Sequence, residues 1–283
     1  MNTKGFFNYN GKIYSNDVTV ISPDNRSFRY GDGFFETMKV MNGQLLLKEL
    51  HVERITASLQ KLSFEESSFF HSDDFIEEIL SLTDNDKCNR LARVRVNFFR
   101  GNGGLYDAES MKINYIIQAW AANDAVNRFN ENGLVMDVYT EARKACDAFS
   151  HLKNNNYLSY VMAALWAKEN KLNDAVLLNN YNRIADSTIA NIFIVKDGTI
   201  KTPALTEGCI AGVMRNYLLR CMRKEGLPIE ETQIDVDDLT EASELFVTNV
   251  MQGIRWIKQM GNTNYNKQLS LYLFQKYVEP LYE

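Results

Sequence analysis

Several features that mark large classes of protein are missing from this sequence. Its 283 residues contain no run of about 18 apolar residues that could cross a bilayer, and the first residues lack the apolar core of a signal peptide. The formal net charge of -5 also leaves no basic excess with which to neutralise a nucleic-acid backbone. We therefore expect a cytoplasmic protein that acts on small molecules, without nucleic acid or membrane partners.

Cysteine and histidine are both scarce. The four cysteines include no CxxC pair, and the three histidines, His51, His71 and His151, have no ligand spacing with one another or with the cysteines. The sequence thus predicts neither a disulfide framework nor a metal site. It also lacks a P-loop, a dinucleotide-binding glycine pattern and a nucleophile elbow. These absences favour an enzyme whose chemistry comes from an organic cofactor.

The patterns that are present alternate between strand and helix. Asn10-Gly11, Asn42-Gly43 and Asp197-Gly198 each separate two strand-like runs, which predicts three hairpins. Apolar spacing and end signals predict helices over residues 49–62, 73–82, 157–170 and 213–225. A polar segment over 121–132 has neither periodicity, so we expect it to link an N-terminal domain, 1–120, to a C-terminal domain, 133–283. The fold class expected is α+β, a mixed α/β protein whose hairpins favour antiparallel or mixed sheets.

One predicted strand has a charged face. In the run RLARVRVNFF, Arg93, Arg95 and Asn97 alternate with apolar residues, so one face packs while the other presents positive groups. That polar face is a candidate for the wall of a cleft.

Lys153 lies between a strand-like region and a helix. A lysine that forms a Schiff base needs a partly desolvated site that lowers its pKa, because only the free amine attacks an aldehyde. Local sequence alone does not separate such a lysine from a surface lysine.

The segment around this lysine, SHLKNNNYL, resembles the lysine motif of the class IV aminotransferase family. These fold-type-IV pyridoxal-phosphate enzymes include branched-chain and D-amino acid aminotransferases and 4-amino-4-deoxychorismate lyase. Four further segments resemble the family in order along the chain: FRYGDGFFETMKVMNGQLLL, HVERITASL, IADSTIANIFIVKDGTIKTP and GCIAGVMRNYLL. The resemblance implies an N-terminal two-layer α/β sandwich, a C-terminal barrel-like α/β domain, pyridoxal 5'-phosphate in the cleft between them, and a homodimer.

Carried over by position, the resemblance assigns a cofactor-binding set. Lys153 would hold the cofactor as a Schiff base, and Arg54 would bind its phosphate through paired guanidinium donors. Further phosphate contacts would come from a helix start and a strand end, at Gly212, Val213, Met214, Thr248 and Asn249.

The resemblance gives the pyridine nitrogen a carboxylate partner, which holds the nitrogen protonated so that the ring acts as an electron sink. The family uses glutamate there, whereas this chain has Asp186. Aspartate is one methylene shorter, so either the cofactor lies closer to its strand or a water bridges the gap.

Two segments resemble the lyase in particular. FFRGNGGLYDAES resembles its arginine and glycine loop, with Arg100 and Tyr106 at matching positions, and FVTNVMQGIRWI resembles its TNxxxGI form. Arg100 and Arg255, with Arg93 or Arg95 as further candidates, would meet the two carboxylates of aminodeoxychorismate. Lys153 would then remove the ring proton next to the imine, and p-aminobenzoate and pyruvate would be released.

Two other functions stay open. One is an amino acid aminotransferase of the branched-chain or D-amino acid type, for which Glu36 in YGDGFFET is an equally suitable substrate-site residue. The other is a binding protein that kept the fold and lost catalysis. Asp186 supports that third function, while Lys153 and Arg54 speak against it.

Overall fold

The computed structural model describes residues 5–65, 70 and 72–283. Contacts divide the chain into two units, of which the first comprises Met1–Asp124 with Lys153–Asn156 and the second Ala125–Leu152 with Tyr157–Glu283. The change of unit after Asp124 falls within residues 121–132. Lys153–Asn156, which the sequence had placed in the C-terminal domain, make their contacts with the first unit instead.

The first unit is built on one antiparallel sheet with the strand order β2-β1-β6-β5-β3-β4. Its elements are β1 (Phe6–Tyr9), β2 (Lys12–Ser15), α1 (Arg26–Tyr30), β3 (Gly33–Met41), β4 (Gln44–Leu45), α2 (Lys48–Lys61), α3 (Asp73–Asn85), β5 (Leu91–Phe99) and β6 (Asn114–Ala121). Both predicted hairpins are confirmed, since Asn10 and Asn42 each have a φ of 50° and are followed by a glycine of positive φ.

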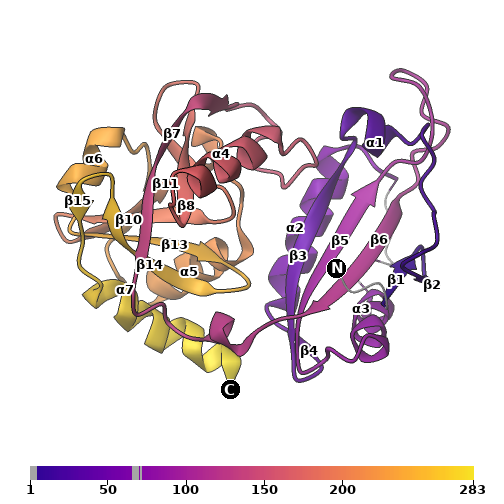
Figure 1. Ribbon diagram of the computed structural model, residues 1–283, viewed down its shortest axis with the longest axis horizontal. Coiled ribbons are helices and arrows are strands. Elements are labelled where there is room, and N and C mark those ends of the chain that lie inside the picture. The colour runs from indigo at the N-terminus through magenta and orange to yellow at the C-terminus, as the bar shows by residue number, and fades with distance from the viewer. Residues whose placement is uncertain (1–4, 66–69, 71) are drawn as a thin grey trace. The chain divides into compact units, whose positions relative to one another are not determined.

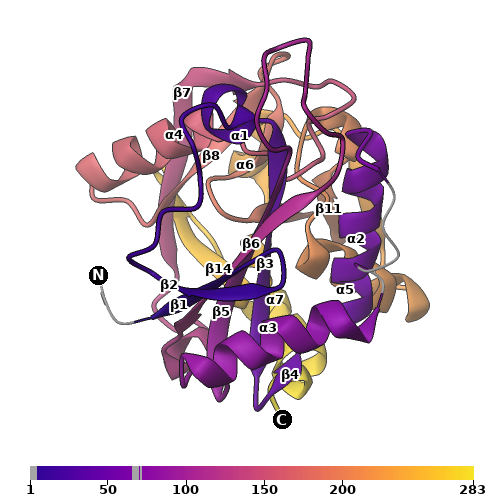
Figure 2. The ribbon, with the colours of Figure 1, turned by 90° about the vertical axis from the view of Figure 1, so that its right-hand side faces the viewer.

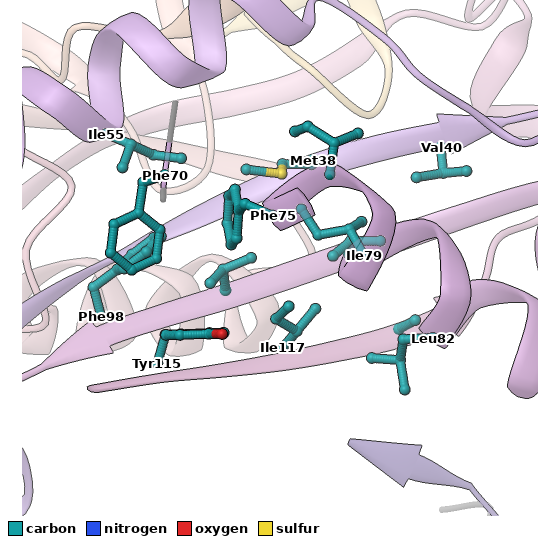
Figure 3. Close-up of a cluster of buried hydrophobic side chains, with 14 of the residues drawn as sticks. Met38, Val40, Ile55, Phe70, Phe75, Ile79, Leu82, Phe98, Tyr115 and Ile117 are labelled. Atoms are coloured by element: carbon teal, nitrogen blue, oxygen red, sulfur yellow. The ribbon is translucent and has the colours of Figure 1, made fainter. Parts of the chain in front are cut away.

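Helices α2 and α3 cover one face of this sheet (Figure 2). Alternation along β3 turns Phe34, Met38 and Val40 toward the helices. Figure 3 shows Met38 and Val40 in a single core with Ile55 of α2 and Phe75, Ile79 and Leu82 of α3. The odd-numbered residues of β3 therefore face the other side of the sheet.

The second unit contains a larger mixed sheet of order β12-β11-β10-β13-β14-β7-β8-β9, with β15 paired to β14. Its elements are β7 (Leu134–Lys144), α4 (Leu158–Glu169), β8 (Asp174–Asn179), β9 (Ile184–Ser187), β10 (Asn191–Lys196), β11 (Thr199–Pro203), α5 (Val213–Lys224), β12 (Ile229–Thr232), α6 (Val236–Glu241), β13 (Glu244–Asn249), β14 (Gly253–Met260), β15 (Thr263–Asn264) and α7 (Gln268–Leu273). Short 3-10 or π turns cover Asp124–Asn127, Leu205–Glu207, Phe274–Val278 and Glu279–Tyr282.

This sheet curls, so that β9 at one end contacts β10 near the other. Its inner face holds an aliphatic core that includes Met136, Val176, Ile194, Val247 and Ile257. Helix α4 packs outside on β7 and β8 (Figure 1), and α5 packs outside on β13.

The predicted helices over α4 and α5, the Asp197-Gly198 hairpin and the fold class are confirmed. Within the described residues, no helix is long and apolar enough to span a membrane.

Candidate active site

The backbone around Lys153 continues the first sheet at the start of β3. The Phe35 amide donates to the Lys153 carbonyl at 2.9 Å, the Asn155 amide donates to the Gly33 carbonyl at 3.1 Å, and Asn154 forms a bridge with Phe34. Gly33 suits this approach, because a Cβ there would lie 2.9 Å from Nδ2 of Asn155 and 2.2 Å from the Phe98 carbonyl oxygen. The ammonium Nζ of Lys153 lies 5.1 Å from the centre of the Phe35 ring.

This position changes the acidity of the lysine. The pKa of Lys153 is lowered to about 7, chiefly by burial and then by the charge of Arg54; Glu36 opposes the change, and Arg95 and Arg93 add smaller lowering effects. A large fraction of the amine is therefore neutral near neutral pH, which is what a nucleophilic lysine requires.

Arg54, which lies near enough to lower the pKa of Lys153, is held by a carboxylate. Its Nε donates to Oε2 of Glu36 at 3.0 Å, and its Nη2 donates to Oε1. Glu36 also contacts Nδ1 of His51 at 2.5 Å and is 1% exposed. Burial disfavours the charged form of Glu36, but Arg54 and His51 outweigh it and lower its pKa to about 2.

His51 lies one helical turn before Arg54 on α2, so both side chains reach the same carboxylate. Burial lowers the pKa of His51 more than Glu36 raises it, so the ring is neutral. Its proton then lies on Nδ1 and is donated to Glu36, while Nε2 is buried with no partner among the described residues.

This tautomer gives a test with two variants. Asparagine can place its amide nitrogen where Nδ1 lies, whereas leucine leaves the Glu36 oxygen without that donor. We expect His51→Leu to lower the free energy of unfolding by about 1–3 kcal/mol and His51→Asn to lose clearly less. Urea denaturation measures both; equal losses would show that the ring acts by packing and not by donation.

In the second unit, Asp186 is buried on the α4 side of the curled sheet. Its Oδ2 accepts from Nζ of Lys144 at 3.2 Å, from the Tyr160 hydroxyl at 3.1 Å and from the Ile210 amide at 3.0 Å. Asp186 is 1% exposed. It is therefore a carboxylate fixed by three donors, and not a loose turn residue.

Three of the residues expected to bind phosphate, Gly212, Val213 and Met214, lie at the start of α5. Gly212 is the N-cap, and a Cβ there would lie 2.0 Å from Oδ1 of Asn191, so a side chain does not fit. Asn191 is paired in register with Thr248, whose hydroxyl is buried and has no partner in the described part of the chain. The first amides of the helix are those of Val213 and Met214. A hydroxyl without a hydrogen-bond partner near such amides is suited to bind an anionic group.

Asn249, the next residue, is used differently. Its Oδ1 accepts from the amides of Met251 and Gln252 at 3.0 and 2.9 Å, which closes the turn between β13 and β14. Its carboxamide oxygen thus serves the turn.

Arg100 is buried and already engaged within the first unit. Its guanidinium donates to Asp32 and to the carbonyl of Leu62 and lies 4.3 Å from the centre of the Phe64 ring. Asp32 also accepts from Nε of Arg26 at 2.8 Å. Arg26 in turn donates to the carbonyl of Gly104, so Asp32 links Arg100 to the loop that follows it.

The other expected substrate residues are scattered. Tyr106, in the loop after Arg100, is 97% exposed. Arg255 is in register with Val247, which puts it on the inner face of the curled sheet, whereas Thr248 points to the outer face. Glu36 faces Arg54 and His51, as described above.

A different set of cations shares one face of the first sheet. Register pairs Lys39 with Arg93 and Thr37 with Arg95, so all these side chains lie on the face opposite the helices, the face of Phe35. Arg95 lies 3.8 Å from the centre of the Phe35 ring, over which Lys153 also lies. Burial lowers the pKa of Lys39 to about 7. Lys39, which is fully buried, and Arg93 and Arg95 thus lie on one face of the sheet near Lys153; these three residues are called the cation face.

Four side chains of these clusters were not found from the sequence: His51, Lys39, Lys144 and Tyr160. His51 could have been found from the sequence, because it lies three residues before Arg54 in a predicted helix and so shares its face. The others depend on strand register or on contacts between distant segments. Among the described residues, from which His71 is missing, no cluster of three or more histidine, cysteine, aspartate or glutamate side chains could hold a metal.

The first unit carries a buried lysine whose pKa is lowered, and the second carries a buried, unpartnered threonine hydroxyl on the strand next to Asn191, which contacts the N-cap of α5. The chain belongs to the amino-transferase class IV family, whose model matches residues 33–260. The family resemblance drawn from the motifs is confirmed.

The similarity extends over most of the chain. It is 30% identical over 238 residues to the aminodeoxychorismate lyase of Vibrio harveyi, covering 83% of this chain and 86% of the relative. It is 26% identical over 264 residues to a putative branched-chain-amino-acid aminotransferase of Methanocaldococcus jannaschii, covering 92% and 90%. The crystal structure of the Thermoproteus uzoniensis branched-chain aminotransferase shares the fold, with a TM-score of 0.86 at 18% identity over 98% of this chain and 95% of that one.

Proposed function

We propose that this protein is a pyridoxal-phosphate enzyme that converts 4-amino-4-deoxychorismate into p-aminobenzoate and pyruvate. The observation that carries the proposal is the cation face beside a lysine of lowered pKa. The proposed substrate carries two carboxylates, which the basic side chains on one strand pair can bind. An apolar amino acid side chain would make no such contacts with them.

The cofactor, when bound, supplies an electron-withdrawing ring that stabilises negative charge next to the amino group of the substrate. We assign its covalent attachment to Lys153 and its phosphate to Arg54, Thr248 and the backbone at the start of α5. Thr248 supports this assignment because, within the described residues, its buried hydroxyl has no hydrogen-bond partner. We assign the ring nitrogen to Asp186.

The side chains of the protein then have separate tasks. The neutral amine of Lys153 accepts the proton from the substrate ring carbon and returns a proton to the departing pyruvate. Arg93 and Arg95, with Lys39, hold the substrate carboxylates. We prefer them to Arg100 and Arg255, because Arg100 is paired with Asp32 and Arg255 lies on the inner face of its sheet.

An amino acid aminotransferase is the second candidate. It is supported by the similarity to the Methanocaldococcus jannaschii aminotransferase, which is 26% identical and covers 92% of this chain. In addition, Arg100, the arginine of one of the two lyase-like segments, is paired with Asp32 and is therefore less available to a substrate carboxylate.

One experiment separates the two. The purified protein is loaded with pyridoxal phosphate and given aminodeoxychorismate or, separately, a panel of L- and D-amino acids. We expect p-aminobenzoate and pyruvate in equal amounts, measured by fluorescence and by a coupled pyruvate assay. Conversion of bound cofactor to its amine form by amino acids, without an aromatic product, would instead establish the aminotransferase.

We further propose that the enzyme is a cytoplasmic homodimer. Helix α4 supports a dimer, because Leu158, Val161, Met162 and Leu165 lie on one helical face and are 73%, 49%, 44% and 49% exposed. Its buried side is formed by Tyr160, Ala163 and Ala167. An apolar stripe of this kind on the surface marks a contact with another protein.

The dimer proposal predicts a clear effect of one charge. Leu165→Glu is expected to reduce the mass in light scattering from two chains to one, because a buried carboxylate without a partner opposes association. Tyr181→Glu, at another exposed apolar residue that is 64% accessible, is the control and should leave the mass unchanged. A wild-type protein of single-chain mass, or a dimer that tolerates Leu165→Glu, would remove this surface from the interface.

A further inference from the structure

Lys144 and Asp186 form a buried ion pair between β7 and β9. Nζ of Lys144 lies 3.2 Å from Oδ2 of Asp186, and the two side chains are 8% and 2% exposed. Oδ2 also accepts from Tyr160 and from the Ile210 amide. The single proton of the Tyr160 hydroxyl is shared with Oδ1, 3.2 Å away. Among the described residues Oδ1 has no other donor, so it has room for one, whereas Oδ2 is engaged by Lys144 and the Ile210 amide as well.

The neighbouring titratable groups add no charge to this pair. Burial, together with the charge of Asp186, raises the pKa of Tyr160, so its hydroxyl remains a neutral donor. Burial raises the pKa of the Cys209 thiol to about 12, so it too stays neutral. Arg215 is paired with Glu231 at 2.6 Å. The ammonium of Lys144 and the carboxylate of Asp186 therefore largely cancel each other.

This cancellation matters for the ring nitrogen of the cofactor. A carboxylate favours the protonated form of a neighbouring nitrogen, and a nearby cation disfavours it. A bare aspartate and an aspartate already paired with lysine are thus different partners for the same nitrogen.

We propose that Lys144 is a positioning residue that holds Asp186 through Oδ2, leaves Oδ1 for the ring nitrogen, and offsets the carboxylate charge, so that the nitrogen is protonated less firmly than Asp186 alone would make it. This inference rests on the proposed function, in which Asp186 serves that nitrogen.

The test uses the full-length protein loaded with pyridoxal phosphate labelled with nitrogen-15 in its ring, because the NMR shift of that atom reports its protonation. Titrations compare the wild type with Lys144→Met, which removes the charge, and Lys144→Arg, which keeps it. In Lys144→Met we expect the pKa of the ring nitrogen to rise by roughly 1–3 units. Lys144→Arg is expected to titrate like the wild type.

Each other outcome counts against the inference. A folded, cofactor-loaded Lys144→Met protein with an unchanged titration, or a shift of the same size in Lys144→Arg, would leave Lys144 with a structural role only. If thermal unfolding shows that Lys144→Met does not fold, Lys144→Gln keeps a donor without charge and is read in the same way. A wild type that never attaches the cofactor would instead contradict the proposed function, and no variant would then give a ring signal.

Discussion

Replacing Lys153 with alanine is expected to lower turnover by at least about 10⁴-fold, because the variant loses both the amine that attaches the cofactor and the group that moves the proton. The neutral amine that the wild type supplies follows from its pKa of about 7, to which burial contributes most. The rate of cofactor attachment in the wild type should therefore rise as the pH increases through about 7 and level off above it.

Attachment can be measured independently of turnover. Borohydride reduction of the loaded wild type, followed by peptide mass spectrometry, should locate the cofactor on the peptide that contains Lys153, and Lys153→Ala should give no adduct. Lys153→Met is the matched control for folding, since it keeps the length of the side chain without the charge that burial disfavours. We expect it to unfold at the wild-type temperature or above. An adduct on another lysine in Lys153→Ala would overturn the assignment.

The parts of the fold that were predictable are those that depend on a few neighbouring residues. Asn10 and Asn42 take positive φ angles and are followed by glycine, so their hairpins could be found from two letters each. The start of α5 after Gly212 could likewise be predicted from the neighbouring residues. The alternation in β5 identified the polar face that carries Arg93 and Arg95, although not the strand that lies beside it.

The parts that were missed depend on register and on distant contacts. That Lys39 stands opposite Arg93 follows from the pairing of β3 with β5, which no local pattern specifies. Lys144 and Asp186 are 42 residues apart and meet through the pairing of β7, β8 and β9. Arg100 is a similar case, because a motif arginine in a glycine loop gives no sign that Asp32, 68 residues earlier, takes its guanidinium.

Replacing Arg54 with methionine is expected to destabilise the protein by about 3–5 kcal/mol at pH 7, because Glu36 would be left buried without its main counter-charge. His51 still donates a hydrogen bond to Glu36 but is the weaker of the two partners, because burial lowers its own pKa. The double variant Arg54→Met with Glu36→Gln removes the stranded charge, and we expect it to recover part of the lost stability. It should not recover the phosphate affinity that Arg54 is proposed to provide.

The dependence of this loss on pH distinguishes charge from packing. The pKa of Glu36 is about 2 in the folded protein, against an ordinary value of 4.5, so its ionisation contributes stability that is fully present above pH 4.5 and is lost as the pH falls toward 2. A pKa difference of this size between the folded and unfolded protein corresponds to about 3 kcal/mol of unfolding free energy. The gap in unfolding free energy between the wild type and Arg54→Met, measured by urea denaturation, should therefore be widest above pH 4.5 and should narrow as the pH is lowered to 3. A gap that stays constant would mean that Arg54 stabilises α2 by packing, and that the charge on Glu36 is held by groups other than Arg54.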